Sequence, residues 1–241
     1  MKTCVFQVNV DCDAPLITFC MSEVEKWAYS NNYDYKIIND LSTWAINFPF
    51  SEINNKICVQ KYETLSHLIN HYDTLIHIDS DVLPIFNPSI PHVKFGVFDY
   101  EQSLHPEIFK SYKDAGIIYC SDKNLADNLF SFFDKYDGSC LPSNTIKEEY
   151  LFNCWIKHQS QHVSTLPHKK YYKPRFCGIH RNTVNYYPPL NSFIHFTGKR
   201  KEKGYYHFVQ WLKHVDNTFG CHNFDHFPDA FDEPQVERER W

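Results

Sequence analysis

The sequence predicts a single α/β domain built on a mostly parallel central sheet that is flanked by helices. Three observations support this fold class. Segments with the pattern of strands alternate with segments of helical spacing in the first half of the chain, which is typical of βαβ units. Residues 74–78 form a mostly apolar run, as expected for a strand that is covered on both faces. The length of 241 residues is sufficient for one substantial core.

The elements of the first half follow one another in the order strand, helix, strand, loop and helix. A first strand is predicted over residues 4–10. Residues 15–31 then place apolar side chains at helical spacing, with Asp13 as a candidate cap and Pro15 in the first turn. The remaining strand, loop and helix are predicted over residues 35–38, 40–55 and 57–72.

The second half is more irregular but contains both kinds of element. Strands are predicted over residues 93–98, 115–119 and 192–196. Helices are predicted over residues 125–133, 146–158 and 205–219. We expect one domain over residues 1–220 and a charged tail over residues 221–241.

Composition and charge exclude several classes of protein. The net charge of −5, from 24 basic and 29 acidic residues, argues against a nucleic-acid partner. Nine cysteines without any C-x-x-C pair argue against a disulfide framework or a zinc ribbon and favour a cytoplasmic protein. No run of 18 apolar residues occurs, so we expect no transmembrane segment. The aromatic content of 17% indicates either a Phe-rich core or a cleft lined by rings.

Asp79-Ser80-Asp81 is the first candidate site, because it directly follows the apolar strand over residues 74–78. Open α/β sheets bind ligands at the carboxyl ends of their strands. The i, i+2 spacing can aim both carboxylates to one side of an extended chain. Two such charges repel each other unless a cation, such as a hard divalent ion, neutralises them. A solvated turn is the alternative, since Asp11-Cys12-Asp13 shows the same spacing elsewhere.

The second candidate site is the segment 193–201 near the carboxyl end. His195 lies in an apolar strand, and the following Gly198 allows the backbone to approach a ligand closely. An imidazole beside two carboxylates would fit Mn²⁺ better than an all-oxygen Mg²⁺ site. The alternatives are a core histidine and a solvated basic face. The cations that can meet phosphates are Lys199, Arg200, Lys201 and Lys203.

These motifs resemble those of a known family. The strand over residues 75–83 resembles the Asp-x-Asp strand of GT-A glycosyltransferases. His195-Phe196-x-Gly198-x-x-Lys201 is similar to the C-terminal motif of glycosyltransferase family 8, which includes glycogenin. Two segments between them, 114–118 and 148–153, are similar to the family's Asn-(Ala/Ser)-Gly-Val and Asp-Gln-x-x-(Leu/Phe)-Asn segments. The resemblance extends from about residue 4 to about residue 215.

The resemblance implies a Rossmann-like GT-A fold and a metal-dependent hexosyltransferase. The donor would be a nucleotide sugar, usually a UDP-sugar, and transfer would retain the anomeric configuration. The acceptor would be a glycan, a protein or a small molecule. Mn²⁺ or Mg²⁺ would be ligated against the diphosphate by Asp79, Asp81 and His195.

Further site residues are carried over from the same motifs. The resemblance implies that Asp99 lies near the sugar and that Asp114 stands where the family has Asn. Contacts to the donor are implied for Lys61, Ser80, Gly198 and Lys201. Gln7 and Asn9 in the first strand can bind a base edge, although they do not match the family's nucleobase contacts cleanly.

Glu148 and Glu149 stand where the family has Asp and Gln beside the anomeric carbon of the sugar. A carboxylate at Glu149 could stabilise an oxocarbenium ion or attack it. A shift of one residue in the alignment would exchange the roles of the two glutamates. The alternative is a solvated helix start, where acidic side chains favour the amino-terminal end of the helix dipole.

Three other functions compete with a transferase. A non-catalytic protein that binds a nucleotide sugar or a glycan would keep the site and lack turnover. A nucleotidyltransferase would need a Gly-rich phosphate loop, and residues 7–15 contain no glycine. A structural module would leave the order and spacing of the two motifs unexplained.

Overall fold

The structure is a computed structural model. The part of the chain that it describes consists of residues 1–89, 92–99, 112–139, 141, 147–166, 171–172, 191–196, 204–206, 208–209, 212–213 and 227–228. Apart from residues 227–228, the predicted tail over residues 221–241 lies outside this part. Of the helix predicted over residues 205–219, the described residues up to 213 are helical.

A six-stranded sheet forms the centre of the molecule, with strand order β2-β1-β3-β6-β5-β7. β6 runs antiparallel to both of its neighbours, and the other neighbouring pairs are parallel. The mostly parallel sheet predicted from the sequence is therefore confirmed. The strands are β1 Thr3–Val8, β2 Asp34–Ile38, β3 Thr74–Ile78, β5 Phe95–Asp99, β6 Lys113–Cys120 and β7 Ser164–Thr165.

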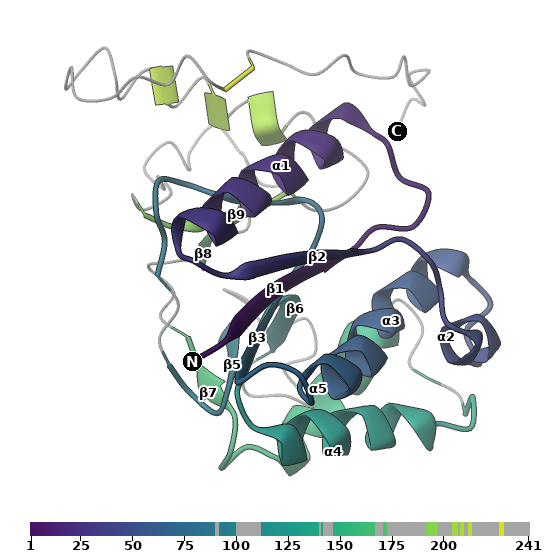
Figure 1. Ribbon diagram of the computed structural model, residues 1–241. Coiled ribbons are helices and arrows are strands. Elements are labelled where there is room, and N and C mark those ends of the chain that lie inside the picture. The colour runs from purple at the N-terminus through teal and green to yellow at the C-terminus, as the bar shows by residue number, and fades with distance from the viewer. Residues whose placement is uncertain are drawn as a thin grey trace.

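Helices cover both faces of this sheet (Figure 1). Side chains of a strand alternate between its faces, and β1 shows this directly. Val5 packs with residues of α1, whereas its neighbours Cys4 and Phe6 belong to the core on the side of α3, α4 and α5. The helices are α1 Pro15–Ser30, α2 Thr43–Asn47, α3 Ile53–Leu68, α4 Lys123–Asp134 and α5 Lys147–His158.

Aromatic rings fill much of the core between α3, α4 and α5. Tyr62 stacks on Phe133 with ring centroids 4.2 Å apart, and it also stacks on Phe152. Phe152 in turn stacks on Trp155. All four rings are buried, so a good part of the aromatic content packs the core, as one of the two interpretations of the sequence predicts.

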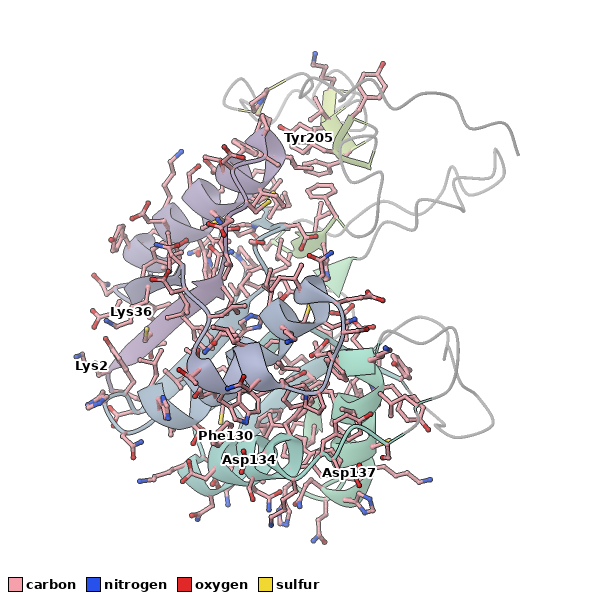
Figure 2. The ribbon with its side chains drawn as sticks, turned by 90° about the vertical axis from the view of Figure 1, so that its right-hand side faces the viewer. Lys2, Lys36, Phe130, Asp134, Asp137 and Tyr205 are labelled. Atoms are coloured by element: carbon pink, nitrogen blue, oxygen red, sulfur yellow. The ribbon has the colours of Figure 1, made fainter. Side chains whose placement is uncertain are left out.

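A second, three-stranded sheet has the order β4-β9-β8 and consists of β4 Val82–Pro84, β8 Tyr171–Tyr172 and β9 Phe193–His195. It packs with α1 and with the helical residues around Tyr205 in a core of its own. Figure 2 shows Tyr205 at one end of the molecule, with Phe130 and Asp134 of α4 at the other. Because β9 pairs antiparallel with β4, the late segment of the chain returns to the point where β3 ends.

Several elements differ from the sequence-based expectation. The predicted loop over residues 40–55 contains α2 and the start of α3. α2 begins after Ser42, whose hydroxyl accepts a hydrogen bond from the amide of Ala45. The cap of α1 is Ala14 and not Asp13. The short strands β4, β7 and β8 were not predicted.

Candidate metal and donor site

The candidate site begins at the carboxyl end of β3, where the chain turns sharply into β4. The amide of Asp79 donates to the carbonyl of Gly116 at 2.7 Å, and the amide of Val82 donates back to the carbonyl of Asp79 at 3.1 Å. The Gln7 side-chain amide also donates to the Asp79 carbonyl, at 3.1 Å. β1, β3 and β6 together therefore fix the backbone that presents Asp79 and Asp81.

His195 reaches these carboxylates from the second sheet. In the register of β4 and β9 it lies opposite Val82, and the following amide, of Phe196, donates to the Asp81 carbonyl at 3.0 Å. His195 Nε2 lies 3.1 Å from Asp81 Oδ1 and 3.7 Å from Asp79 Oδ2. Within the part of the chain that the structure describes, these three residues form the one group with a ligand-atom geometry that could hold a metal ion, all within 4.8 Å of one another.

The chemistry of this donor set fits a divalent cation. Burial by itself lowers the pKa of His195, but the carboxylates of Asp81 and Asp114 outweigh that effect and raise the pKa to about 9. The site therefore attracts positive charge strongly. Two carboxylate oxygens and one imidazole nitrogen are a donor set that can coordinate a divalent cation.

A cavity of about 170 Å³ adjoins the two aspartates. Its wall is formed by residues of β1, α3 and β3 and by the turn after β3. A ligand in this cavity would contact both the carboxylates and the buried ammonium group of Lys61 in α3. The polar groups in the wall include Lys61, His77, Asp79, Ser80 and Asp81.

Lys61 of α3 is a fully enclosed cation that connects the candidate metal site to α5. Its ammonium group donates to the carbonyl of Ala115 at 3.1 Å and lies 3.6 Å from Asp79 Oδ1 and 3.3 Å from Glu148 Oε1. Burial alone would lower the Lys61 pKa, but the carboxylates of Asp79 and Glu148 raise it above its usual range. Lys61 thus stays charged and neutralises part of the excess negative charge.

Glu148 and Glu149 are both buried at the start of α5, with 2% and 7% of their surface exposed, so the solvated helix start is excluded. The Tyr62 hydroxyl donates to Glu148 Oε1, the same oxygen that faces Lys61. Burial raises the pKa of Glu148, and Lys61 partly opposes this rise. Glu148 is therefore held by α3.

Asn153, the last residue of the motif segment 148–153, anchors α5 to β6, a role that the sequence analysis did not assign to it. Its side-chain oxygen accepts from the Lys113 amide at 2.6 Å, and its side-chain nitrogen donates to the Lys113 carbonyl at 2.9 Å. The same nitrogen donates to the carbonyl of Glu149 at 2.8 Å. This set of bonds fixes the turn of α5 that bears Glu149. The signal in the sequence was the asparagine that ends this segment, four residues after Glu149.

Asp99, expected near the sugar, and Asp114, which stands where the family has Asn, have different surroundings. Asp99 at the end of β5 accepts a hydrogen bond from the Lys113 ammonium group, which also donates to the Thr165 hydroxyl. Asp114 is fully buried in β6 and accepts from the amide of Gly116 at 2.6 Å. Its Oδ1 lies 3.5 Å from Nδ1 of His195, on the other side of the ring from Asp81.

The remaining expected donor contacts divide into three groups. Gln7 is fully buried, with its oxygen accepting from the Tyr35 hydroxyl at 2.6 Å, and Asn9 donates to the Cys12 carbonyl at 2.9 Å. Ser80 lines the cavity. Gly198 and Lys201 lie outside the described residues.

His77 is a site residue that the sequence analysis did not single out. Its Nε2 lies 3.5 Å from Asp79 Oδ1, and its Nδ1 is buried with no hydrogen-bond partner among the described residues. Burial, Lys61 and His195 lower its pKa well below the usual range, so the ring is neutral. The signal in the sequence was a histidine two residues before Asp79, on the same side of the strand.

Gly116 leaves the space that the His195 ring occupies. A Cβ at this position would lie 2.5 Å from Cε1 and 2.6 Å from Nδ1 of the ring, and 2.7 Å from Asp114 Oδ1. We expect Gly116→Ala to displace the ring and to weaken Mn²⁺ binding by about 10-fold or more, as measured by calorimetric titration. Gly96→Ala is the control, because its Cβ would crowd the side chain of Leu166 instead. An equal loss of affinity in both variants would contradict a specific role for Gly116.

Comparisons with known proteins agree with this geometry. No protein-family model and no curated protein sequence matches the chain. Among solved structures, it is similar to a glycosyltransferase involved in the glycosylation of the major capsid of PBCV-1, with 11% identity over 84% of this chain and 97% of that one and a TM-score of 0.57. It is also similar to the galactosyltransferase LgtC in complex with donor and acceptor sugar analogs, with 12% identity over 92% and 98% of the two chains and a TM-score of 0.53.

A third similar structure is mouse xyloside xylosyltransferase 1, with 9% identity over 81% of this chain and 97% of that one and a TM-score of 0.51. These similarities establish the fold, which is that of GT-A glycosyltransferases. Among the described residues, no helix has the length and apolar character that crossing a membrane requires.

Proposed function

We propose that this protein is a metal-dependent glycosyltransferase that moves a sugar from a nucleotide sugar to an acceptor. One observation supports it above all others: Asp79, Asp81 and His195 converge at the carboxyl end of β3, beside a cavity. On this fold, that edge of the sheet is where ligands bind. The motif resemblance to family 8 adds a UDP-sugar donor, Mn²⁺ and retention of configuration to the proposal.

The leaving group is the first part of the proposed reaction. The bond between the anomeric carbon and the β-phosphate oxygen breaks, and the nucleoside diphosphate departs with the electron pair. A divalent cation held by Asp79, Asp81 and His195 would supply positive charge to this diphosphate. Lys201, predicted to contact a phosphate, would add to it. Because the charge on the diphosphate grows as the bond breaks, such contacts stabilise the transition state more than the ground state.

The second part of the proposed reaction is stabilisation of the anomeric carbon, which we assign to the acidic residues at the start of α5. Glu148 is held by Tyr62 and Lys61, so we assign Glu149 to the position beside the anomeric carbon. Its carboxylate stabilises the cation-like carbon while the acceptor oxygen bonds to it from the side on which the diphosphate leaves. The departing diphosphate oxygen, which gains negative charge, can take the proton of the acceptor hydroxyl. This arrangement retains the anomeric configuration.

Glu149→Gln tests whether this carboxylate acts by charge or as a nucleophile. We expect turnover to fall on the order of 10- to 100-fold and to keep the same anomeric configuration, because the amide oxygen keeps a dipole at the cationic carbon. Product configuration is measured by NMR. Glu23→Gln, which alters a surface ion pair with Lys26, is the control. Complete loss of transfer, with release of the nucleoside diphosphate restored by external azide and a glycosyl azide of inverted configuration as the product, would show an obligatory nucleophile instead.

A thermal-shift screen tests the proposed function as a whole. Nucleotide sugars are added with Mn²⁺ or with EDTA, and every stabilising pair is assayed for release of the nucleoside diphosphate. A ligand that binds the folded protein raises its melting temperature, so we expect a shift for a UDP-sugar only when Mn²⁺ is present. Stabilisation without turnover under any acceptor would favour the non-catalytic binding protein. No stabilisation by any nucleotide sugar would refute both.

A further inference from the structure

His195 has an acidic partner on each side of its ring. Nε2 faces the two aspartates of the turn after β3, whereas Nδ1 faces Asp114 Oδ1 at 3.5 Å. Both His195 and Asp114 are buried, with 4% and 0% of their surface exposed. The imidazole therefore lies between two groups: the carboxylates of Asp79 and Asp81, which would share a cation, and the carboxylate of Asp114 on the opposite side of the ring.

Asp114 is itself held rigidly in place. Its Oδ1 accepts a hydrogen bond from the amide of Gly116 at 2.6 Å, within the same strand. The absence of a side chain at Gly116 lets the imidazole approach both this backbone and the carboxylate. The position of Asp114 is thus set by β6, which lies in the centre of the main sheet.

An imidazole that binds a cation uses the lone pair of one nitrogen and holds a proton on the other. A carboxylate behind the ring accepts a hydrogen bond from that second nitrogen, and this selects the tautomer and fixes the plane of the ring. In this site Nε2 faces the two aspartates that would hold the cation, so a proton held on Nδ1 would point at Asp114.

We propose that Asp114 is a positioning residue that holds the tautomer and the orientation of His195 for cation binding, rather than a contact to the sugar. The inference rests on the metal site of the proposed function and gives Asp114 a role that its alignment with the family's Asn does not supply. Asp114 raises the affinity of the site for Mn²⁺ by acting through His195.

The test measures Mn²⁺ affinity in the absence of donor, by electron paramagnetic resonance of the free ion. We expect Asp114→Ala to weaken binding by about 10- to 100-fold. Asp114→Asn keeps an oxygen that can accept from Nδ1, so we expect a smaller loss. Asp137→Asn, an exposed loop residue, is the matched control and leaves the affinity unchanged. Circular dichroism of each variant confirms that the fold is intact.

A double-mutant cycle separates positioning from a general structural role. If Asp114 acts through His195, then Asp114→Ala changes Mn²⁺ affinity by less than about threefold in the His195→Ala background. A full loss in that background would overturn the proposal. So would unchanged Mn²⁺ affinity in Asp114→Ala together with a raised KM for the donor, which would make Asp114 a contact to the donor instead. Wild-type protein that binds no Mn²⁺ would refute the metal site itself.

Discussion

Replacing Asp79 or Asp81 by asparagine is expected to reduce metal-dependent release of nucleoside diphosphate on the order of 100- to 1000-fold. An asparagine keeps the size of the side chain and removes one negative charge from the group that faces His195. The cation would then be held too weakly to neutralise the leaving diphosphate. Initial rates are measured with a nucleotide sugar over a series of Mn²⁺ concentrations, because a weakened site should recover part of its activity at high Mn²⁺.

Asp73→Asn provides the matched control. Asp73 directly precedes the first residue of β3, at the end of the strand opposite to Asp79. Its Oδ2 accepts a hydrogen bond from the amide of Lys2 at 2.7 Å. An asparagine oxygen can accept the same bond, so we expect turnover to remain within about twofold of the wild type. Wild-type activity in Asp79→Asn or Asp81→Asn would show that these carboxylates hold no catalytic cation.

Replacing Lys61 by methionine is expected to lower both the free energy of unfolding and the turnover rate. Methionine has a similar length but leaves the buried Glu148 carboxylate without the cation that lies 3.3 Å away. Removing one partner of a buried ion pair costs about 3–5 kcal/mol of the free energy of unfolding. For a chain of this length, that corresponds to a melting temperature lower by roughly 6–20 °C. The change is measured by calorimetry, with turnover assayed below the new transition.

Two further variants test whether the unpaired Glu148 carboxylate causes the loss of stability in Lys61→Met. Lys26→Met removes a cation of an exposed ion pair with Glu23 and should cost at most about 1 kcal/mol. Lys61→Met combined with Glu148→Gln removes both buried charges, so we expect much of the lost stability to return. If the double variant is as unstable as Lys61→Met alone, Glu148 is not the group that Lys61 compensates.

The long elements of the fold could be predicted from the sequence because their patterns are local. α1 shows helical spacing of buried residues, and β3 is an apolar run that is buried throughout. α2 and β4 are too short for a period to be recognised, with five and three residues. The start of α3 was also missed, because Ile53 and Asn54 are exposed and the first turn of the helix shows no apolar face.

The site could be predicted only in part, because some of its residues follow a local pattern and others depend on contacts that are distant in sequence. The carboxylates at the end of β3 follow from a local pattern, and His195 came from the resemblance of a second motif. The structure brings these three side chains together, and their role as metal ligands stays a prediction. The roles of Glu148 and Asp114 depend on contacts with residues distant in sequence. Tyr62 lies 86 positions from Glu148, and His195 meets Asp114 only because β9 pairs with β4.

The central claim is that a nucleoside diphosphate binds this protein through a cation held by Asp79, Asp81 and His195. Calorimetric titration with UDP tests it most directly, in Mn²⁺ and in EDTA, for the wild type and for His195→Ala. We expect UDP to bind the wild type at least about 10-fold more tightly with Mn²⁺, and this difference to be largely lost in His195→Ala. Equal UDP affinity of the wild type in Mn²⁺ and in EDTA would contradict the claim.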